Sequence, residues 1–479
     1  MPSITSTGVG SGLDVNSIVT QLMAIERRPL SLLQQAKTDL NTQVSSFGQL
    51  QSLTSAMRDA AQALTSVSTW NQTVASSADT SAVTVTTTTG AAAGKYAVSV
   101  DHLAAAQTIS SQPLPNSTST LNEGTLTIEL GSWTDEPTPS GFIPKQGASP
   151  VTVTIGPGDT SLEGIRDKIN ASAAGVTASI IKDASGARLA LRSRETGAEN
   201  AFRITAVETV DDGSVASGLS SLGFDATVSS PMTRNQSAVN AKAKINGIDV
   251  ESASNQLDGT IDGLTLQLLK PTAGEVAINV SADTDSVKAK INSFVSSFNS
   301  LASFIREQTK YNPDSKTAGS LQGDRVVGTV LQQLRGVLNT ASTGSSTFAR
   351  LSDIGIAMKA DGTLETNSTK LDSALSNLPE LRKLLAADTG SGAALGFMTR
   401  YRNLGDQLLE TDGAFNSRSK SLQSMIERND KSQASLQLRL DNTETRMRAQ
   451  YQALDVSMAK LNGLSSYISG QIAQLNKTA

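Results

Sequence analysis

Residues 440–475 read LDNTETRMRAQYQALDVSMAKLNGLSSYISGQIAQL. A large apolar side chain recurs at every seventh position, the spacing at which one helix presents a continuous stripe to another helix. A second apolar line, four residues further on, is interrupted by Glu444 and Ser465, polar residues that weaken a coiled coil but can fix its register. The stripe consists of Leu440, Met447, Leu454, Leu461, Ile468 and Leu475. The pattern predicts a long C-terminal helix of the coiled-coil type.

This stripe needs a partner. Burying one large apolar side chain stabilises a protein by roughly 1.5–3 kcal/mol. Six such residues left in water therefore forfeit as much as the net stability of a typical domain, about 5–15 kcal/mol. An isolated helix of this length is also marginal in water. The partner is either the N-terminal helix of the same chain or another subunit, while an ordinary core helix is the alternative interpretation.

The N-terminal helix is predicted to begin after Asp14, whose side chain suits the N-cap position. It carries Ile18, Leu22 and Ile25 on one apolar face, and Pro29 should end or kink it. These three residues, together with the six of the C-terminal stripe, are the candidate interaction surface of the chain.

Between the two helical ends, the apolar residues alternate with polar ones, which is typical of strands. Residues 124–204 look like a compact β-rich unit with one helix, which a capping box of Thr160 and Glu163 begins. The pair Asn246-Gly247 predicts a hairpin, because both residues tolerate positive φ angles. The helical period returns at about Ser286. The fold class is therefore α+β and multidomain, with a helical stalk built from both chain ends and nested β-rich head domains.

The change of period also predicts discontinuous domains. The four expected parts are a terminal helical leg region (1–40 and 425–479), a helical stalk domain (41–72 and 285–424), a β-rich head domain (73–115 and 236–284) and a second β-rich head domain with one helix (116–235). Both termini should lie together at the foot of the stalk.

Composition argues against several classes of function. The 479-residue chain has a net charge of −4 and a pI near 5.3, so it lacks the basic field that nucleic-acid binding requires. It has no cysteine and one histidine, His102, which excludes thiol catalysis and two-histidine metal motifs. The acidic pairs Asp135-Glu136 and Asp211-Asp212 lie in polar stretches and are interpreted as solvated loops. We predict no enzymatic activity, no cofactor and no metal.

The sequence also bears on localisation. No stretch approaches the 18 or so apolar residues of a membrane span. The N-terminus lacks the positive start and apolar run of a signal peptide. The protein is therefore expected to stay in the cytoplasm, or to leave the cell by a route that needs no cleaved signal.

Several motifs resemble one known family. GSGLDVNSIV at residues 10–19 and ERRPL at 26–30 are similar to the opening of FliD-type flagellar filament-capping proteins. INGI at 245–248 resembles the head region of that family, and DIGI at 353–356 resembles its returning stalk. Residues 124–204 resemble the repeat shared by flagellins, hook proteins and cap proteins.

The resemblance implies a secreted, extracellular protein at the tip of the bacterial flagellar filament. It implies a ring-shaped homo-oligomer, a pentamer, that acts as an assembly factor and promotes folding and insertion of exported flagellin. The implied partners are flagellin, hook–filament junction proteins, the type III export apparatus and a dedicated export chaperone. Under this hypothesis residues 1–40 and 430–479 are mobile in the free protomer and become ordered on assembly.

Two other functions remain open at this point. The head could be a surface adhesin that binds host mucin or glycans, although no cluster of aromatic residues marks a sugar site. A hydrolase of cell-wall polymers is the third hypothesis, but the sequence has no motif that supports it.

Overall fold

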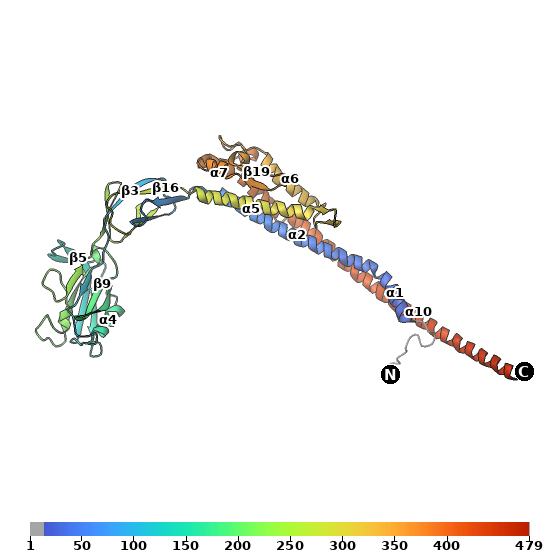
Figure 1. Ribbon diagram of the computed structural model, residues 1–479, viewed down its shortest axis with the longest axis horizontal. Coiled ribbons are helices and arrows are strands. Elements are labelled where there is room, and N and C mark those ends of the chain that lie inside the picture. Colours follow the sequence, from blue (N-terminus) through green and yellow to red (C-terminus); the bar gives the residue numbers. More distant parts are fainter. Residues whose placement is uncertain (1–13, 479) are drawn as a thin grey trace. The chain divides into compact units, whose positions relative to one another are not determined.

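The computed structural model describes residues 14–478, and the side chains of residues 14–474. The chain divides into two compact units. One unit combines the residues up to Trp70 with those from Thr284 onward and is mainly helical; the other, residues 71–283, is built from strands (Figure 1). This division follows the change of apolar period along the sequence. The finer division into four parts stays a prediction.

The helical unit contains long helices from both ends of the chain, with two short hairpins, β17–β18 and β19–β20, between them. Its helices are α1 (Val15–Glu26), α2 (Arg28–Thr65), α3 (Val67–Trp70), α5 (Thr284–Thr309), α6 (Arg325–Asn339), α7 (Ser368–Leu375), α8 (Leu378–Ala386), α9 (Phe397–Leu409) and α10 (Ala414–Thr478). The hairpin strands are β17 (Tyr311–Asn312), β18 (Thr317–Ala318), β19 (Ile356–Met358) and β20 (Leu364–Thr366).

The helical unit has one apolar core, to which α2, α5 and α9 contribute half of the large side chains. Tyr401 packs against Phe294 and Phe298, with ring centroids 5.1 Å and 5.9 Å apart. The Tyr401 hydroxyl donates to the Leu334 carbonyl at 3.1 Å, so the ring is buried without leaving a polar atom unpaired. Burial raises the pKa of Tyr401 well above its usual value.

The β unit contains four sheets and one long helix, α4 (Leu162–Ala171). A five-stranded sheet has the order β1-β16-β3-β12-β13, a three-stranded sheet β14-β15-β2, a four-stranded sheet β11-β4-β9-β8, and in the remaining sheet β5 pairs with β10, β6 and β7. The strands are β1 (Thr73–Ser77), β2 (Val83–Thr87), β3 (Gly94–His102), β4 (Thr108–Ser110), β5 (Gly124–Thr134), β6 (Gly141–Pro144), β7 (Val151–Ile155), β8 (Val176–Asp183), β9 (Gly186–Ser193), β10 (Ala201–Glu208), β11 (Thr233–Gln236), β12 (Ala241–Ile245), β13 (Ile248–Ser252), β14 (Gln256–Ile261), β15 (Leu264–Leu268) and β16 (Val276–Ala282).

Two separate apolar cores hold the β unit together. One lies among the sheets that contain β3 and β15. The other lies among α4, β5, β9 and β10. Because the second core is formed by residues between β3 and β12, it is an insertion into the first, as the nested pattern of the sequence predicts.

Several local predictions are confirmed, and some need correction. The Asn246-Gly247 turn joins β12 and β13, with φ angles of 50° and 82°. The cap of α4 is not Thr160 as predicted but Ser161, whose hydroxyl accepts from the Gly164 N–H at 3.1 Å. The sequence offers two adjacent hydroxyl residues there, and the backbone geometry selects the second. Within the returning helical part, residues 368–386 form two helices, α7 and α8, and Pro379 stands in the first turn of α8.

Candidate functional site

The terminal helices meet within the helical unit, where α1 lies along α10 (Figure 1). Asp14 caps α1 as predicted, since its carboxylate accepts from the Ser17 N–H at 3.0 Å. A small apolar cluster forms between the two helices, with further partly buried side chains at its rim. Its buried members are Val15, Val19, Met23, Leu436 and Leu440, and its rim is formed by Leu30, Leu33, Met447 and Tyr451. The stripe of α10 therefore begins by packing against its own chain.

The face of α1 that packs against α10 is not the one formed by Ile18, Leu22 and Ile25, and a role of these three residues in binding another molecule stays a prediction. Ile18 and Leu22 are only half-buried, and Ile25 is 58% exposed. The buried residues are instead Val15, Val19 and Met23. They follow one another at intervals of four residues and form a single ridge along the helix. Apolar residues occupy more than one side of this helix, so the position of α10, and not the sequence of α1, decides which side is covered.

Polar contacts hold α1 in register on α10. The Arg27 guanidinium contacts the Glu444 carboxylate at 3.0 Å, and Glu444 also accepts from Arg448 at 2.9 Å. Arg448 donates in turn to the Asn16 side-chain oxygen at 3.0 Å. Hydrogen bonding from Arg448, with a further contribution from Arg27, lowers the pKa of Glu444. Glu444, which interrupts the apolar line, is therefore the residue that fixes the register.

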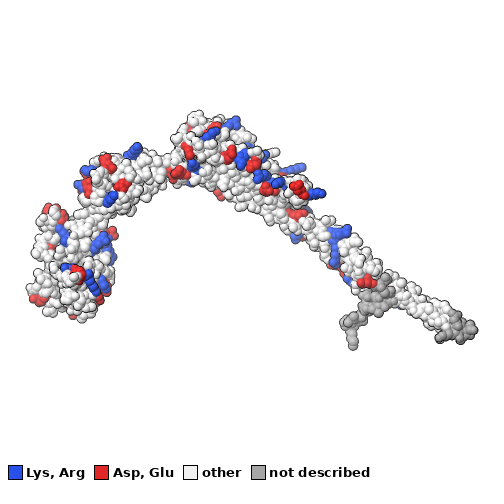
Figure 2. Space-filling model, in the orientation of Figure 1, with Lys and Arg blue, Asp and Glu red and all other residues white. Residues whose placement is uncertain are grey.

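The stripe of α10 continues beyond this contact without cover. Leu454, Leu461 and Ile468 are 45%, 59% and 48% exposed, and the side chain of Leu475 lies outside the described residues. Leu464, Tyr467 and Ile472 are also exposed. Figure 2 shows few charged residues on this part of α10, and between residues 456 and 474 the sequence has only one, Lys460. An uncharged apolar stripe of this kind is typical of a surface that binds another protein.

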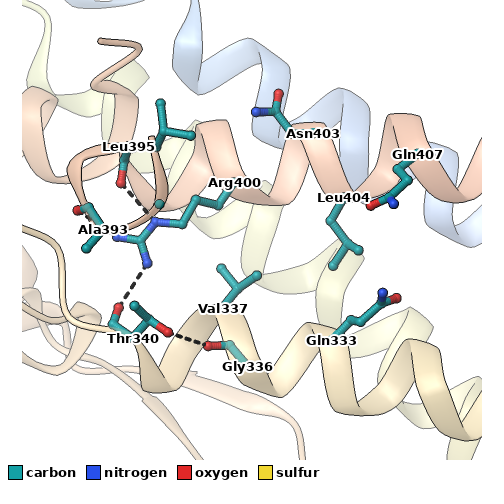
Figure 3. A pocket seen from close by; sticks show the side chains of 11 residues that line it. Gln333, Gly336, Val337, Thr340, Ala393, Leu395, Arg400, Asn403, Leu404 and Gln407 are labelled. Atoms are coloured by element: carbon teal, nitrogen blue, oxygen red, sulfur yellow. Dashed lines mark hydrogen bonds between the residues drawn. The ribbon is translucent and has the colours of Figure 1, made fainter. Parts of the chain in front are cut away.

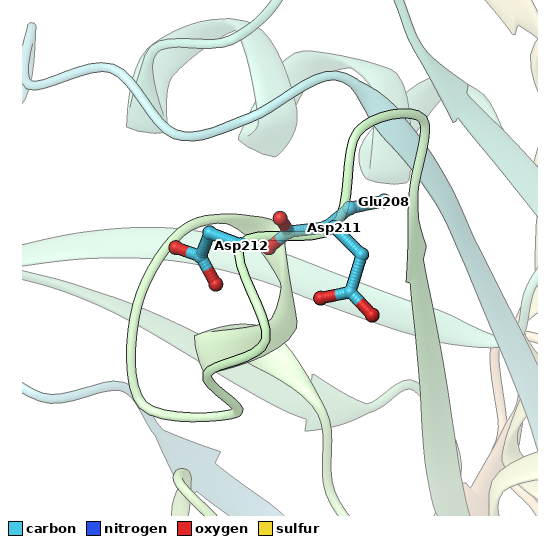
Figure 4. Close-up of side chains that lie close together, drawn as sticks. All are labelled: Glu208, Asp211 and Asp212. Carbon is cyan, nitrogen blue, oxygen red and sulfur yellow. The ribbon is translucent and has the colours of Figure 1, made fainter.

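The structure brings together three carboxylates that the sequence did not connect. Glu208, Asp211 and Asp212 have ligand atoms within 4.8 Å of one another (Figure 4). Each already accepts hydrogen bonds from its own loop: Glu208 from the Ser220 N–H, Asp211 from Gly213 and Asp212 from Ser214. Hydrogen bonding from Ser217 and Ser214 lowers the pKa of Asp212. These carboxylates stabilise a loop, in agreement with the interpretation of Asp211-Asp212 as a loop pair.

The other candidate residues of the sequence are His102 and the acidic pair Asp135-Glu136. His102 lies exposed at the end of β3, opposite Lys242 of β12. Glu136 pairs with Arg234 at 2.6 Å, so this acidic pair has a structural partner. In the part of the chain that the structure describes, no helix has the length and hydrophobicity needed to cross a membrane.

Comparisons with known proteins agree with this architecture. Residues 11–107 match the family model of the flagellar hook-associated protein 2 N-terminus, residues 238–463 match that of its C-terminus, and residues 144–195 match the flagellin hook IN motif. The chain is 32% identical to flagellar hook-associated protein 2 of Escherichia coli K12, over 98% of both chains. It is 30% identical to the A-type flagellar hook-associated protein 2 of Pseudomonas aeruginosa, over 99% of this chain and 98% of that one.

A solved structure gives the same result for the fold. The D1-D2-D3 domains of the flagellar cap protein FliD from Escherichia coli superpose with a TM-score of 0.58 at 30% identity, covering 79% of this chain and 99% of that one. Fold and sequence together define a structural protein of the bacterial flagellum. The chain belongs to the flagellar hook-associated protein 2 family, the FliD-type filament cap proteins.

These comparisons confirm the resemblance found in the sequence. They give no support to the adhesin alternative, because the relatives above are named for the hook and the cap of the flagellum. Those names likewise describe a structural part and not a reaction.

Proposed function

We propose that this protein forms a ring-shaped cap at the distal end of the flagellar filament, outside the cell, and promotes the folding and insertion of exported flagellin subunits. The membership of the chain in the cap family supports the location. The exposed stripe of α10 supports the mechanism, because a cap must bind its neighbours and release them again as the filament grows.

The mechanism depends on reversible burial. α1 covers the stripe of α10 as far as Met447 and Tyr451, and the residues from Leu454 onward present apolar surface to water. Contact with another protein molecule would bury this surface at roughly 25 cal/mol per Å². Because the side chains are only about half exposed, each contributes a modest amount, and the contact can break when the next subunit arrives.

The proposal also includes the partners and the finer domain division. The cap would be a homo-oligomer, a pentamer in our hypothesis, that leaves the cell through the type III export apparatus with an export chaperone and joins the filament through hook–filament junction proteins. The leg region would comprise residues 1–40 and 425–479, and the two head domains would form the plate over the filament channel.

The double substitution Leu454→Asp and Leu461→Asp tests the proposal. It places two charges on the exposed stripe, where they have no buried contact to disrupt, so the protomer should fold normally while filament growth and motility are lost. The matched control is Gln452→Asp with Ser466→Asp, which adds the same charges to exposed positions on the opposite side of the helix. Normal motility of the stripe variant, or equal loss in the control, would contradict the proposal.

A further inference from the structure

A groove runs between α6 and α9 of the helical unit. Two adjoining cavities of about 560 Å³ and 400 Å³ occupy it, and Gln333 and Gln407 line both of them. Figure 3 shows the Val337 and Leu404 side chains projecting into the space between the helices. From Arg325 to Val337 the groove extends over twelve residues of α6, about 18 Å at 1.5 Å per residue.

The groove has an apolar floor and one open position in its wall. Val330, Leu404 and Leu408 line it and are buried, while Val337 at its rim is partly exposed. Gly336 also lines the groove, and no atom of the described chain lies within 4 Å of a Cβ added there. Because glycine has no side chain, the backbone of another segment can approach α6 closely at this position.

One end of the groove is positively charged. Arg400 donates from its Nε and Nη1 atoms to the carbonyls of Leu395 and Thr340, both at 2.9 Å (Figure 3). These bonds hold the guanidinium at the wall of the groove, where burial lowers the pKa of Arg400. Among residues 14–474 no carboxylate forms an ion pair with it, so its charge can attract a negative group from another molecule.

The other end of the groove is negatively charged. Glu410 and Asp412 line that cavity together with a single cation, Arg325. Both carboxylates are exposed, and neither forms an ion pair within the described part of the chain. A segment that fits the groove is therefore apolar along one side, positive at the end near Glu410 and negative at the end near Arg400.

A short amphipathic α-helix meets these three requirements. About twelve residues of helix span the length of the groove, and apolar residues spaced three and four apart lie on one side of such a helix. The helix macrodipole adds partial positive charge at the N-terminus and partial negative charge at the C-terminus. The charges of the groove therefore set the direction of the bound helix, with its N-terminus at Glu410 and Asp412 and its C-terminus at Arg400.

The exposed stripe of α10 cannot fill the groove in a ring. Ala414, the first residue of α10, lines the acidic end of the groove, and Leu461 of the stripe follows it by 47 residues of the same helix, about 70 Å. The copies in a ring of more than two point the same way and lie at one level, so the stripe of a neighbour is displaced by the same distance. Under the proposed function, the protein that reaches the cap with its helices still unpacked is the exported flagellin subunit.

We propose that the α6–α9 groove binds an amphipathic helix of a flagellin subunit while that subunit folds. An isolated helix of this length is marginal in water, so a groove that covers its apolar side and complements the charges of its two ends favours its formation. Because the floor of the groove is already largely buried, the bound helix gains little additional apolar contact and can leave when the subunit is inserted. The inference rests on the proposed function, to which it adds the surface that promotes folding.

Photo-cross-linking of the full-length chain to flagellin tests this docking. The natural sequence has no cysteine, so a benzophenone maleimide labels a single-cysteine variant only at the chosen position. Gln333→Cys places the label in the groove, and Gln332→Cys places it on an exposed neighbour of α6 that lines neither cavity. With flagellin diluted from denaturant, Gln333→Cys should give at least about tenfold more cross-linked product, because docking raises the effective concentration of the target.

Two further label positions test the direction of the bound helix. Thr329→Cys lies in the acidic cavity and Asn403→Cys in the cavity at Arg400. Mass spectrometry of the products should place the first label on the N-terminal part, and the second on the C-terminal part, of one flagellin segment. The reverse order, or scattered positions along flagellin, would overturn the inference.

Two glycine substitutions in α6 provide a matched pair that blocks or spares the groove. Gly336 and Gly328 both have open space at an added Cβ, but only Gly336 lines the groove. Neither Gly336→Gln nor Gly328→Gln should impair folding, because glutamine favours a helix more than glycine does. Gly336→Gln should reduce cross-linking from the Gln333→Cys position to the control level and slow filament growth, whereas Gly328→Gln should change neither.

Electron micrographs of filaments separate failure of this inference from failure of the proposed function. Capped filaments without preferential cross-linking from the groove would overturn the docking and leave the cap standing. Preferential cross-linking between copies of this chain, or unchanged cross-linking in the Gly336→Gln variant, would also overturn it. Normal filament growth in cells that lack the protein would contradict the inference and the proposed function together.

Discussion

The two stretches of α10 that flank Tyr451 share one sequence pattern but differ in their surroundings. From Leu436 to Met447 the stripe packs against α1, and from Leu454 to Ile472 it is exposed. The covered stretch also carries the Glu444 contacts that fix its register, while the uncovered stretch has almost no charge. A seven-residue period therefore shows that a helix face must be covered, but not which molecule covers it.

The largest expected difference in protomer stability is between the Leu440→Asp and Leu461→Asp variants. Leu440 is 3% exposed, so the first change should cost at least the 2–5 kcal/mol typical of losing a buried leucine, and α1 should detach. Leu461 is 59% exposed, and its replacement should change the stability of the free protomer by no more than about 0.5 kcal/mol. Chemical denaturation and hydrogen exchange of residues 15–26 measure the two effects.

Equal effects of these two substitutions would remove the contrast. If Leu461→Asp also released α1, then α1 would contact the distal stretch in solution. If Leu440→Asp left α1 protected, then the cluster around Val19 would not be what holds the helix.

Hydrogen exchange of the wild-type protomer provides the second test. The sequence predicts mobility of both chain ends over residues 1–40 and 430–479, of which residues 1–13 and 479 lie outside the described residues. Because α1 and residues 436–447 cover each other, we expect high mobility only of the uncovered stretch. Amides of residues 454–474 should exchange at least about tenfold faster than those of 436–447, since the apolar stripe of that part of the helix is exposed and an exposed helix protects its amides only weakly. On assembly the difference should disappear, and a protomer with uniform protection along α10 would contradict the comparison.

Of the two stretches of α10, acid should weaken the contacts of the covered one. The contacts of Glu444 with Arg448 and Arg27 lower its pKa below the ordinary 4.5. The stabilisation they give is therefore present above about pH 4.5 and is lost as the pH falls through the lowered pKa of the folded state. Exchange of the α1 amides, corrected for the intrinsic effect of pH, should rise below that value.

A Glu444→Gln variant is the control for this effect, because it should show faster α1 exchange at neutral pH and little further change in acid. The exchange must be measured at the amides of α1 themselves, and not as the stability of the whole unit. Elsewhere in the helical unit, hydrogen bonds from Lys383, Ser345 and Ser346 lower the pKa of Glu380 to about 2, so global stability also falls in acid. A pH response of α1 that survives in the Glu444→Gln variant would assign it to another group.

Local features of the fold could be predicted from sequence because short-range chemistry determines them. The Asp14 cap, the Asn246-Gly247 hairpin and the alternation in β5 are of this kind. The exact cap of α4 could not be predicted, because Thr160 and Ser161 are chemically equivalent candidates and only the path of the backbone distinguishes them.

The candidate interaction surface of the terminal helices could be predicted in part, again from local sequence patterns. The C-terminal stripe follows from its period, and the cover that α1 gives it was one of the two alternatives. The face of α1 was not predictable, since Ile18 and Val19 are both apolar and lie on different sides of the helix. The groove between α6 and α9 has no signal of its own in the sequence, because it arises only when Val337 and Leu404, from separate helices, face each other.

The smallest expected effects come from replacing glycines by alanine, and they compare two uncovered positions of α10 with a covered position of α9. Gly463 and Gly470 lie in the uncovered stretch with no atom within 4 Å of an added Cβ. Replacing each by alanine should stabilise the helix by about 0.5–1 kcal/mol, because alanine loses less backbone entropy and nothing is displaced. Gly405 of α9 is the covered counterpart, where a Cβ would lie 2.7 Å from the Arg58 Cβ of α2. Circular dichroism on heating should show more helix that melts later for Gly463→Ala and Gly470→Ala, and a lower melting temperature for Gly405→Ala.

Since both distal glycines lie on the side of α10 away from the stripe, filament growth should persist in the alanine variants. Loss of growth there would mean that the cap needs a distal helix that can bend, and not only one that can bind.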